Sequence, residues 1–196
     1  LGEIATEDYS DSEIIRVFTD ARIPRRLQRD LKQYLKHARY PLAVRSSSLL
    51  EDAQFQPFAG IYKTYMIPNN HPDLTERYQQ LLLAIKLVYA STYCESARAY
   101  VKSTFHHAED EKMAVVIQQL TGEAYGLHFY PALSGVAQSY NYYPIAHMKP
   151  EDGLAHIALG LGKIVVEGGG AMRFSPKYPQ FLPQFPSAEK PKGPKP

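Results

Sequence analysis

The segment Val44-Arg45-Ser46-Ser47-Ser48-Leu49-Leu50-Glu51-Asp52 concentrates polar side chains between two apolar stretches. Before it, Pro41-Leu42-Ala43-Val44 is a short apolar run, and after it residues 61–67 are rich in β-branched and aromatic side chains. Runs of this kind are typical of β-strands. The pattern therefore predicts two strands joined by a polar loop that carries an arginine and three serines.

The chemistry of this loop suits an anion. The planar fork of donors on Arg45 matches phosphate oxygens, and the hydroxyls of Ser46 and Ser47 add short neutral donors. Gly60 would let the backbone approach a ligand closely. The pair Glu51-Asp52 suits either a turn cap or a cation, and capping is the more common use. From spacing alone, an exposed serine-rich turn remains the more common interpretation of the loop.

Helical patterns flank this segment on both sides. Asp11-Ser12 can cap a first short helix, and Pro24 suits the first turn of a second helix over residues 25–39. The buried side of this second helix is predicted to hold Leu27, Leu31, Leu35 and Ala38. Apolar residues recur at helical spacing from Leu74 to Tyr89, and a further helical stretch covers 97–101.

Further strands are predicted over residues 113–117, 135–140 and 156–159, so that helices and strands do not alternate regularly. This order favours an α+β fold with a mixed or antiparallel sheet and packed helices. We expect an N-terminal helical segment over 1–40, a sheet-bearing region over 41–176 and a flexible Pro/Lys-rich tail over 177–196. The missing initial methionine and this tail suggest a fragment of a longer protein.

Composition narrows the classes of function. The formal charge of +2 is too small to predict a nucleic-acid partner, and no apolar run is long enough to span a bilayer, so a cytoplasmic location is expected. Arg26, Arg29 and Lys36 share roughly one helix face, which keeps nucleic-acid binding as a rival interpretation, although a solvated charged face is commoner. The single cysteine, Cys94, is predicted to be an apolar filler in a helix rather than a catalytic thiol.

Several motifs occur in the order found in one family of enzymes. The sequence Ala43-Val44-Arg45-Ser46-Ser47, with Glu51-Asp52 and Phe58-Ala59-Gly60 after it, resembles the nucleotide-binding domain of phosphoenolpyruvate synthase, pyruvate phosphate dikinase and related water dikinases. Four further segments resemble that family in the same order: Arg98-Ala99, Ile117-Gln118-Gln119-Leu120, Ser134-Gly135-Val136, and Gly160-Leu161-Gly162 with Val165-Val166 and Gly168. The resemblance runs from about residue 41 to residue 169.

This resemblance implies an ATP-grasp type of fold that holds ATP between two α+β lobes. The adenine would meet the backbone at a hinge formed by Gln119, Leu120 and Thr121, where main-chain groups supply donor and acceptor whatever the side chains. Arg45 would contact the ATP phosphates. The same end of the cleft would be lined by Ser46, Ser47 and Gly60, while Arg98 would support either the site or only the fold.

The resemblance also implies the reaction of the intact protein. ATP would phosphorylate a histidine on a separate domain, which would then phosphorylate pyruvate to phosphoenolpyruvate. Magnesium would assist, with its ligands outside this chain. Lys163 stands where the family has glutamate, and the family's upstream lysine has no counterpart, so the chain alone is not expected to complete phosphoryl transfer. A regulatory module that kept the fold and lost catalysis is the alternative.

Overall fold

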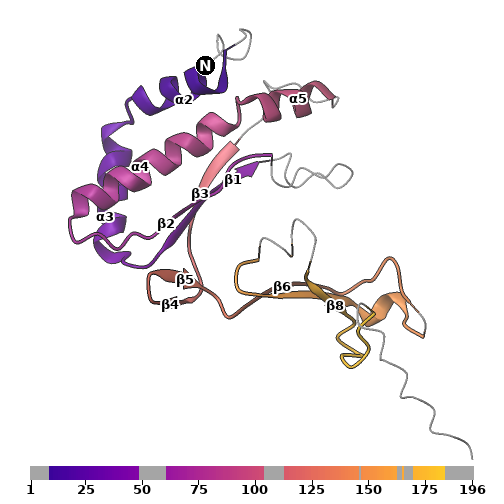
Figure 1. Ribbon diagram of the computed structural model, residues 1–196. Helices are drawn as coiled ribbons and strands as arrows, with labels where there is room; N and C mark the ends of the chain where they lie inside the picture. The colour runs from indigo at the N-terminus through magenta and orange to yellow at the C-terminus, as the bar shows by residue number, and fades with distance from the viewer. Residues whose placement is uncertain are drawn as a thin grey trace, which may run out of the picture. The chain divides into compact units, whose positions relative to one another are not determined.

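The structure is a computed structural model that describes residues 9–48, 61–103, 113–145, 147–162, 165 and 170–183. Its helices and strands form a mixed α+β fold with antiparallel sheets, which confirms the predicted class (Figure 1). The chain divides into two compact units, Leu1–Leu120 and Thr121–Pro196. Within the described residues, no helix is long and apolar enough to cross a membrane.

The sheet of the first unit has the order β2-β1-β3, with strands β1 (Leu42–Ser48), β2 (Tyr65–Ile67) and β3 (Met113–Gln119). All seven residues of β1 pair antiparallel with β3, from Leu42 opposite Gln119 to Ser48 opposite Met113. The prediction of a loop at Arg45, Ser46 and Ser47 was therefore wrong. Pairing with β3 extends the strand through these polar residues, and local composition does not reveal such a tertiary pairing.

The described part of the first unit has four helices: α2 (Asp11–Asp20), α3 (Arg25–His37), α4 (Leu74–Ser91) and α5 (Glu95–Ser103). Helix α2 is capped by Ser10, one residue before the predicted cap, because Ser10 and Glu13 form a capping box. Pro24 lies at the N-cap of α3, where the N–H that proline lacks would have no partner within the helix. The predicted strand over 61–67 is formed only by its last three residues.

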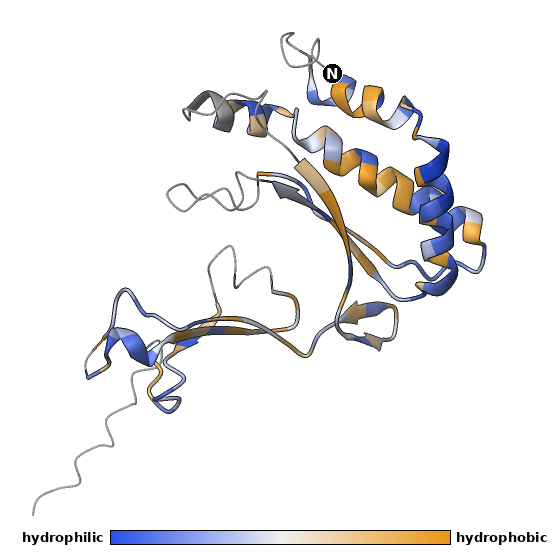
Figure 2. Cartoon of the chain, turned by 180° about the vertical axis from the view of Figure 1, so that it is seen from behind, coloured by the Kyte–Doolittle hydropathy of each residue, from blue (hydrophilic) through white to orange (hydrophobic). Residues whose placement is uncertain are grey.

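One face of this sheet is covered by helices α3 and α4 (Figure 1). Leu31 and Leu35 of α3 and Leu81 of α4 pack with Leu42 and Val44 of β1, and all five are buried. Leu27, predicted on the same side of α3, is 42% exposed instead. Figure 2 shows the matching pattern, with hydrophobic colour along α4 and β3 and hydrophilic colour over most of α3.

A buried polar cluster closes the junction between α3 and α4. Arg77 of α4 is only 1% exposed, and its Nη1 donates to the carbonyl oxygens of Leu35 at 2.9 Å and Ala38 at 3.0 Å. The side chain of Asn69, also buried, donates to the carbonyls of Ala38 and Tyr40 at 3.0 Å each. The end of a helix presents carbonyls without intrahelical partners, together with the negative end of its dipole. A buried guanidinium and an amide therefore terminate α3.

The second unit contains a hairpin, β4 (Glu123–Tyr125) with β5 (His128–Tyr130), and a three-stranded antiparallel sheet of order β6-β7-β8. The strands of this sheet are β6 (Leu133–Gln138), β7 (Leu154–Leu159) and β8 (Met172–Phe174). The hairpin and β8 were not predicted from the sequence. Each of these three strands has only three residues, too few for a clear alternation of apolar and polar side chains.

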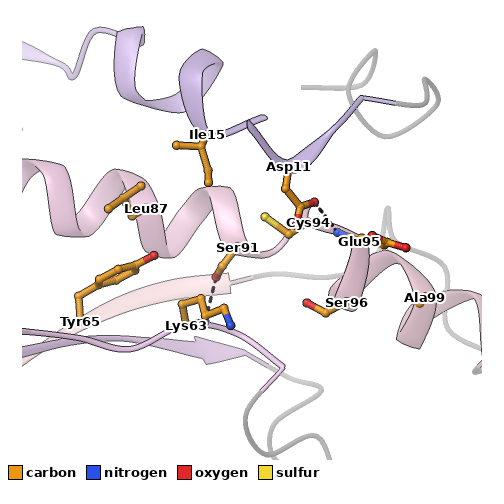
Figure 3. A pocket seen from close by; sticks show the side chains of 10 residues that line it. All are labelled: Asp11, Ile15, Lys63, Tyr65, Leu87, Ser91, Cys94, Glu95, Ser96 and Ala99. Carbon is orange, nitrogen blue, oxygen red and sulfur yellow. Dashed lines mark hydrogen bonds between the residues drawn. The ribbon is translucent and has the colours of Figure 1, made fainter. Parts of the chain in front are cut away.

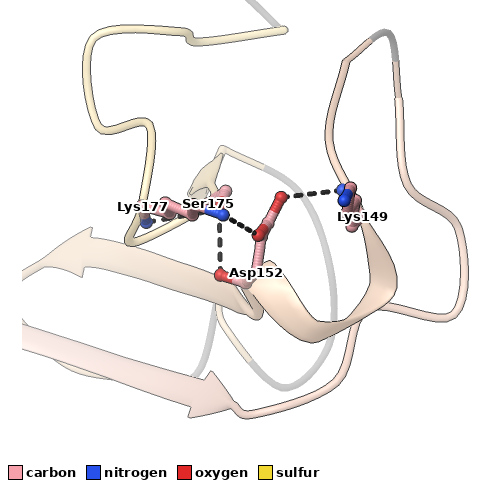
Figure 4. Close-up of polar contacts among 4 residues, drawn as sticks. All are labelled: Lys149, Asp152, Ser175 and Lys177. Atoms are coloured by element: carbon pink, nitrogen blue, oxygen red, sulfur yellow. Dashed lines mark hydrogen bonds and ion pairs between the residues drawn. The ribbon is translucent and has the colours of Figure 1, made fainter.

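Asp152 organises the turn that precedes β7 (Figure 4). Its carboxylate accepts bonds from Lys177 Nζ and from the Lys149 backbone N–H, each at 2.7 Å, and Ser175 Oγ donates to its carbonyl at 3.0 Å. The hydrogen bond from Lys177, followed by that from Lys149, holds the pKa of Asp152 below its ordinary value of 3.8. The 3₁₀ turn η2 (Pro150–Asp152) is thereby tied to the chain that follows β8.

We expect this contact to make the second unit sensitive to acid. Because the pKa of Asp152 is lower in the folded chain, its contribution to stability is complete above pH 3.8 and is lost as the pH falls through the folded value. Hydrogen exchange of the Lys177 amide, measured in the wild type and in Asp152→Asn, tests this. The two proteins should differ at pH 6, and the difference should shrink only as the pH falls below 3.8. A difference that stays equal at every pH at which the chain is folded contradicts the assignment.

Candidate functional site

Alternation along β1 divides its polar residues between the two faces of the sheet. Ser46 and Ser48 are 2% and 5% exposed and share the helix-covered face with Leu42 and Val44. Arg45 and Ser47 are exposed and point to the opposite side, because successive side chains of a strand alternate. Of the three residues predicted to face a phosphate together, the structure brings two onto one surface and buries Ser46 on the other.

The opposite side of the sheet, here called the open face, is defined by the strand register. Ala43 lies opposite Met66 and Gln118, Arg45 opposite Val116, and Ser47 opposite Ala114. The side chains of one cross-strand row point to the same side of a sheet. The open face therefore comprises Ala43, Arg45, Ser47, Met66, Ala114, Val116 and Gln118. It combines one cation with small, apolar and amide side chains.

The chemistry of the open face fits an aromatic or apolar group together with an anion. Arg45 Nε makes a 3.3 Å bond to the Ser46 carbonyl, which holds the root of the guanidinium near the strand. Met66 lies on the edge strand β2 and is 58% exposed, so it offers apolar contact area on the side of β1 away from β3. A guanidinium forms short charge-assisted bonds to phosphate, and a neighbouring hydroxyl adds a donor. Arg45 and Ser47 therefore place a charged and a neutral hydrogen-bond donor on one surface.

The predicted hinge lies where β3 ends. Gln119 is the last residue of β3, and the Leu120 N–H donates to the Pro41 carbonyl at 2.9 Å. The boundary between the two compact units falls between Leu120 and Thr121. Because the Leu120 N–H is already bonded to Pro41, a ligand that needs a backbone donor at the hinge must use the N–H of a neighbouring residue.

Arg98, for which support of either the site or only the fold was considered, is bonded to the main chain of the first unit. Its Nη2 donates to the Tyr9 carbonyl at 2.8 Å, which fastens helix α5 to the segment before α2. This bond supports the fold of the first unit. Gly60, the acidic pair Glu51-Asp52 and Lys163 lie outside the described residues.

A cavity of about 520 Å³ lies between α2, α4, α5 and the segment leading into β2 (Figure 3). Its lining includes Asp11, Lys63, Tyr65, Cys94 and Glu95. Burial, followed by the nearby Asp11 carboxylate, raises the pKa of the Cys94 thiol. The Glu95 N–H donates to Asp11 Oδ1 at 2.8 Å, so this carboxylate already has a structural partner. A thiol with a raised pKa is a poor nucleophile, in line with a packing role for Cys94.

The sequence analysis missed the members of the open face that β2 and β3 contribute. Met66, Ala114, Val116 and Gln118 belong to it only through pairing with β1. Alternation within 113–119 would have divided that strand into two faces. The register that places Val116 beside Arg45 depends on how the strands pair in the folded chain, which the local sequence does not specify. Among the described residues, no three His, Cys, Asp or Glu side chains gather closely enough to hold a metal ion.

A sheet covered by helices on one face, with a cation on the other, defines an α+β domain suited to a phosphate-bearing ligand. Residues 3–184 match the model of the pyruvate phosphate dikinase AMP/ATP-binding domain, and the chain belongs to this family. It is also 30% identical over 134 residues to the uncharacterized phosphotransferase YvkC of Bacillus subtilis (strain 168). That alignment covers 68% of this chain and 14% of YvkC. The family match identifies the chain as an AMP/ATP-binding domain of the pyruvate phosphate dikinase kind.

Proposed function

We propose that the open face forms one wall of an ATP site, with Arg45 and Ser47 at the phosphates and residues 119–121 at the adenine. The observation that carries this proposal is the shared orientation of Arg45 and Ser47 on the face that the described helices leave uncovered. Membership of the family indicates that the ligand is ATP. The guanidinium of Arg45 and the hydroxyl of Ser47 indicate which end of the site holds the phosphates.

The spacing along β3 supports this orientation of the nucleotide. Val116 lies opposite Arg45, and Leu120 follows it four positions later, a distance of about 14 Å at the rise of a strand. The reach of the arginine side chain adds to this distance, which is comparable to an extended nucleoside triphosphate. Between the two ends, the exposed Met66 and the partly exposed Val116 offer apolar area for a flat group, while Ala43 between them is buried.

Catalysis by the intact protein would need groups beyond this wall. Phosphoryl transfer relies on metal ions and several cations to neutralise charge on the moving phosphate. Magnesium would supply that neutralisation when bound, with ligands from outside this chain. The chain spans 14% of its relative YvkC, so additional domains are expected in the intact protein. There, a histidine would take the phosphoryl group and pass it to pyruvate, giving phosphoenolpyruvate.

A regulatory nucleotide-binding module is the second candidate. The observation behind it is Lys163, which reverses the charge of the glutamate expected after Gly160-Leu161-Gly162. A lysine cannot coordinate a metal ion as a carboxylate does. Both candidates share the ATP wall and differ only in whether the phosphoryl group is transferred.

Calorimetric titration with ATP and magnesium tests the wall. Arg45→Ala is expected to weaken ATP binding at least about tenfold, the effect of losing a hydrogen bond to a charged group. Arg16→Ala is the matched control, because Arg16 is exposed on α2 and its side chain lies 3.9 Å from that of the likewise exposed Asp20. Equal affinity of the Arg45→Ala variant and the wild type for ATP would show that Arg45 does not contact the phosphates.

A further inference from the structure

The positive charge of this chain is concentrated around helix α3. Residues 22–39 carry seven cationic side chains and one carboxylate, a net charge of +6. Since the whole chain carries +2, the remaining residues sum to −4. The seven cationic residues are all exposed: Arg22, Arg25, Arg26, Arg29, Lys32, Lys36 and Arg39.

Four of these residues form a continuous stripe along the helix. Arg25, Arg29, Lys32 and Lys36 follow one another at intervals of four, three and four, which keeps them within about 60° of one another at 100° per residue. They span about 17 Å of helix axis at 1.5 Å per residue. We call these four residues the basic stripe, and Arg22 and Arg39 extend it just beyond the two helix ends.

The contacts of the stripe leave its charge largely available. Arg29 Nε lies 3.9 Å from Asp30 Oδ1, and both side chains are more than half exposed, so water screens this pair. Lys32 Nζ lies 4.8 Å from the centre of the Tyr78 ring, which orients this side chain without neutralising it. Leu31 and Leu35 hold the other side of α3 in the core, so the stripe sits on a fixed support.

We infer that the basic stripe docks an acidic polypeptide segment whose carboxylates recur every three or four residues. Such a segment matches the stripe charge for charge, and guanidinium groups bind carboxylates through paired hydrogen bonds. Nucleic acid fits less well, because a long polyanion would also meet the field of the remaining residues, whose net charge is −4. The proposal concerns a surface distinct from the ATP wall and does not depend on it.

The experiment measures fluorescence anisotropy of a labelled 14-residue peptide with glutamates spaced alternately by three and four positions. Arg25→Gln, Arg29→Gln and Lys36→Gln are combined in one variant, because glutamine preserves helix propensity. The matched control combines Arg16→Gln, Lys63→Gln and Lys149→Gln, which removes the same charge elsewhere. Circular dichroism confirms that both variants are folded, and a single-stranded DNA oligonucleotide of equal charge is titrated in parallel.

The wild type is expected to bind the peptide at 50 mM salt and to bind it more weakly at 200 mM. The stripe variant should bind about tenfold more weakly, as expected for three exposed ion pairs, and the control variant should bind like the wild type. The proposal is overturned if the peptide does not bind, if both variants lose the same affinity, or if the oligonucleotide binds more tightly than the peptide.

Discussion

Arg77→Ala is expected to lower the free energy of unfolding of the first unit by about 3–5 kcal/mol, the cost of losing buried charged contacts. The guanidinium is 1% exposed and donates to the Leu35 and Ala38 carbonyls. Alanine would leave these acceptors short of a donor and would open a cavity beside the core. Because the two carbonyls end helix α3, the loss should spread to the contact between α3 and α4.

Denaturant unfolding followed by circular dichroism at 222 nm measures this loss. Arg16→Ala is the control, since its side chain is 84% exposed and its 3.9 Å pair with Asp20 should contribute less than about 1 kcal/mol. An Arg77→Ala protein whose stability equals that of Arg16→Ala would show that Asn69 and water satisfy the carbonyls. Arg77→Met separates charge from volume, because it fills much of the same space without donors.

The sequence predicted much of the fold because its helices are long and periodic. Helix α4 was located from the recurrence of apolar residues, and the pairing of β1 with β3 joins two predicted strands. The burial of Arg77 was not foreseeable, because a charged residue on an amphipathic helix is normally solvated. Its partners come from residues 35 and 38, about forty positions away, so only the packing of α3 on α4 defines them.

The candidate site was predicted in part for a related reason. Arg45 and Ser47 were chosen for their chemistry, and the strand places both of them on the open face. Ser46 was chosen with them because adjacent side chains of a loop can face the same ligand. In a strand, adjacent side chains point to opposite faces of the sheet. The apolar part of the open face depends on register: Met66 joins it only by lying opposite Ala43.

Gly135→Ala is expected to destabilise the sheet of the second unit by about 1–3 kcal/mol, the range for inserting a methyl group into a packed site. A Cβ at this position would lie 2.6 Å from the His156 carbonyl oxygen and 3.2 Å from Ile157 Cγ1. The carbonyl belongs to the neighbouring strand β7, so relief would require β6 and β7 to separate. The strain therefore comes from close approach of two strands rather than from an unusual backbone dihedral.

Gly170→Ala is the matched control, because a Cβ there meets no atom of the described residues within 4 Å. Hydrogen exchange of amides in β6 and β7, compared with those of α4, measures the effect in each unit separately. We expect faster exchange in the two strands of Gly135→Ala and unchanged exchange in α4 and throughout Gly170→Ala. Equal protection in both variants would mean that β7 moves aside at little cost, and close packing would then not explain the glycine at 135.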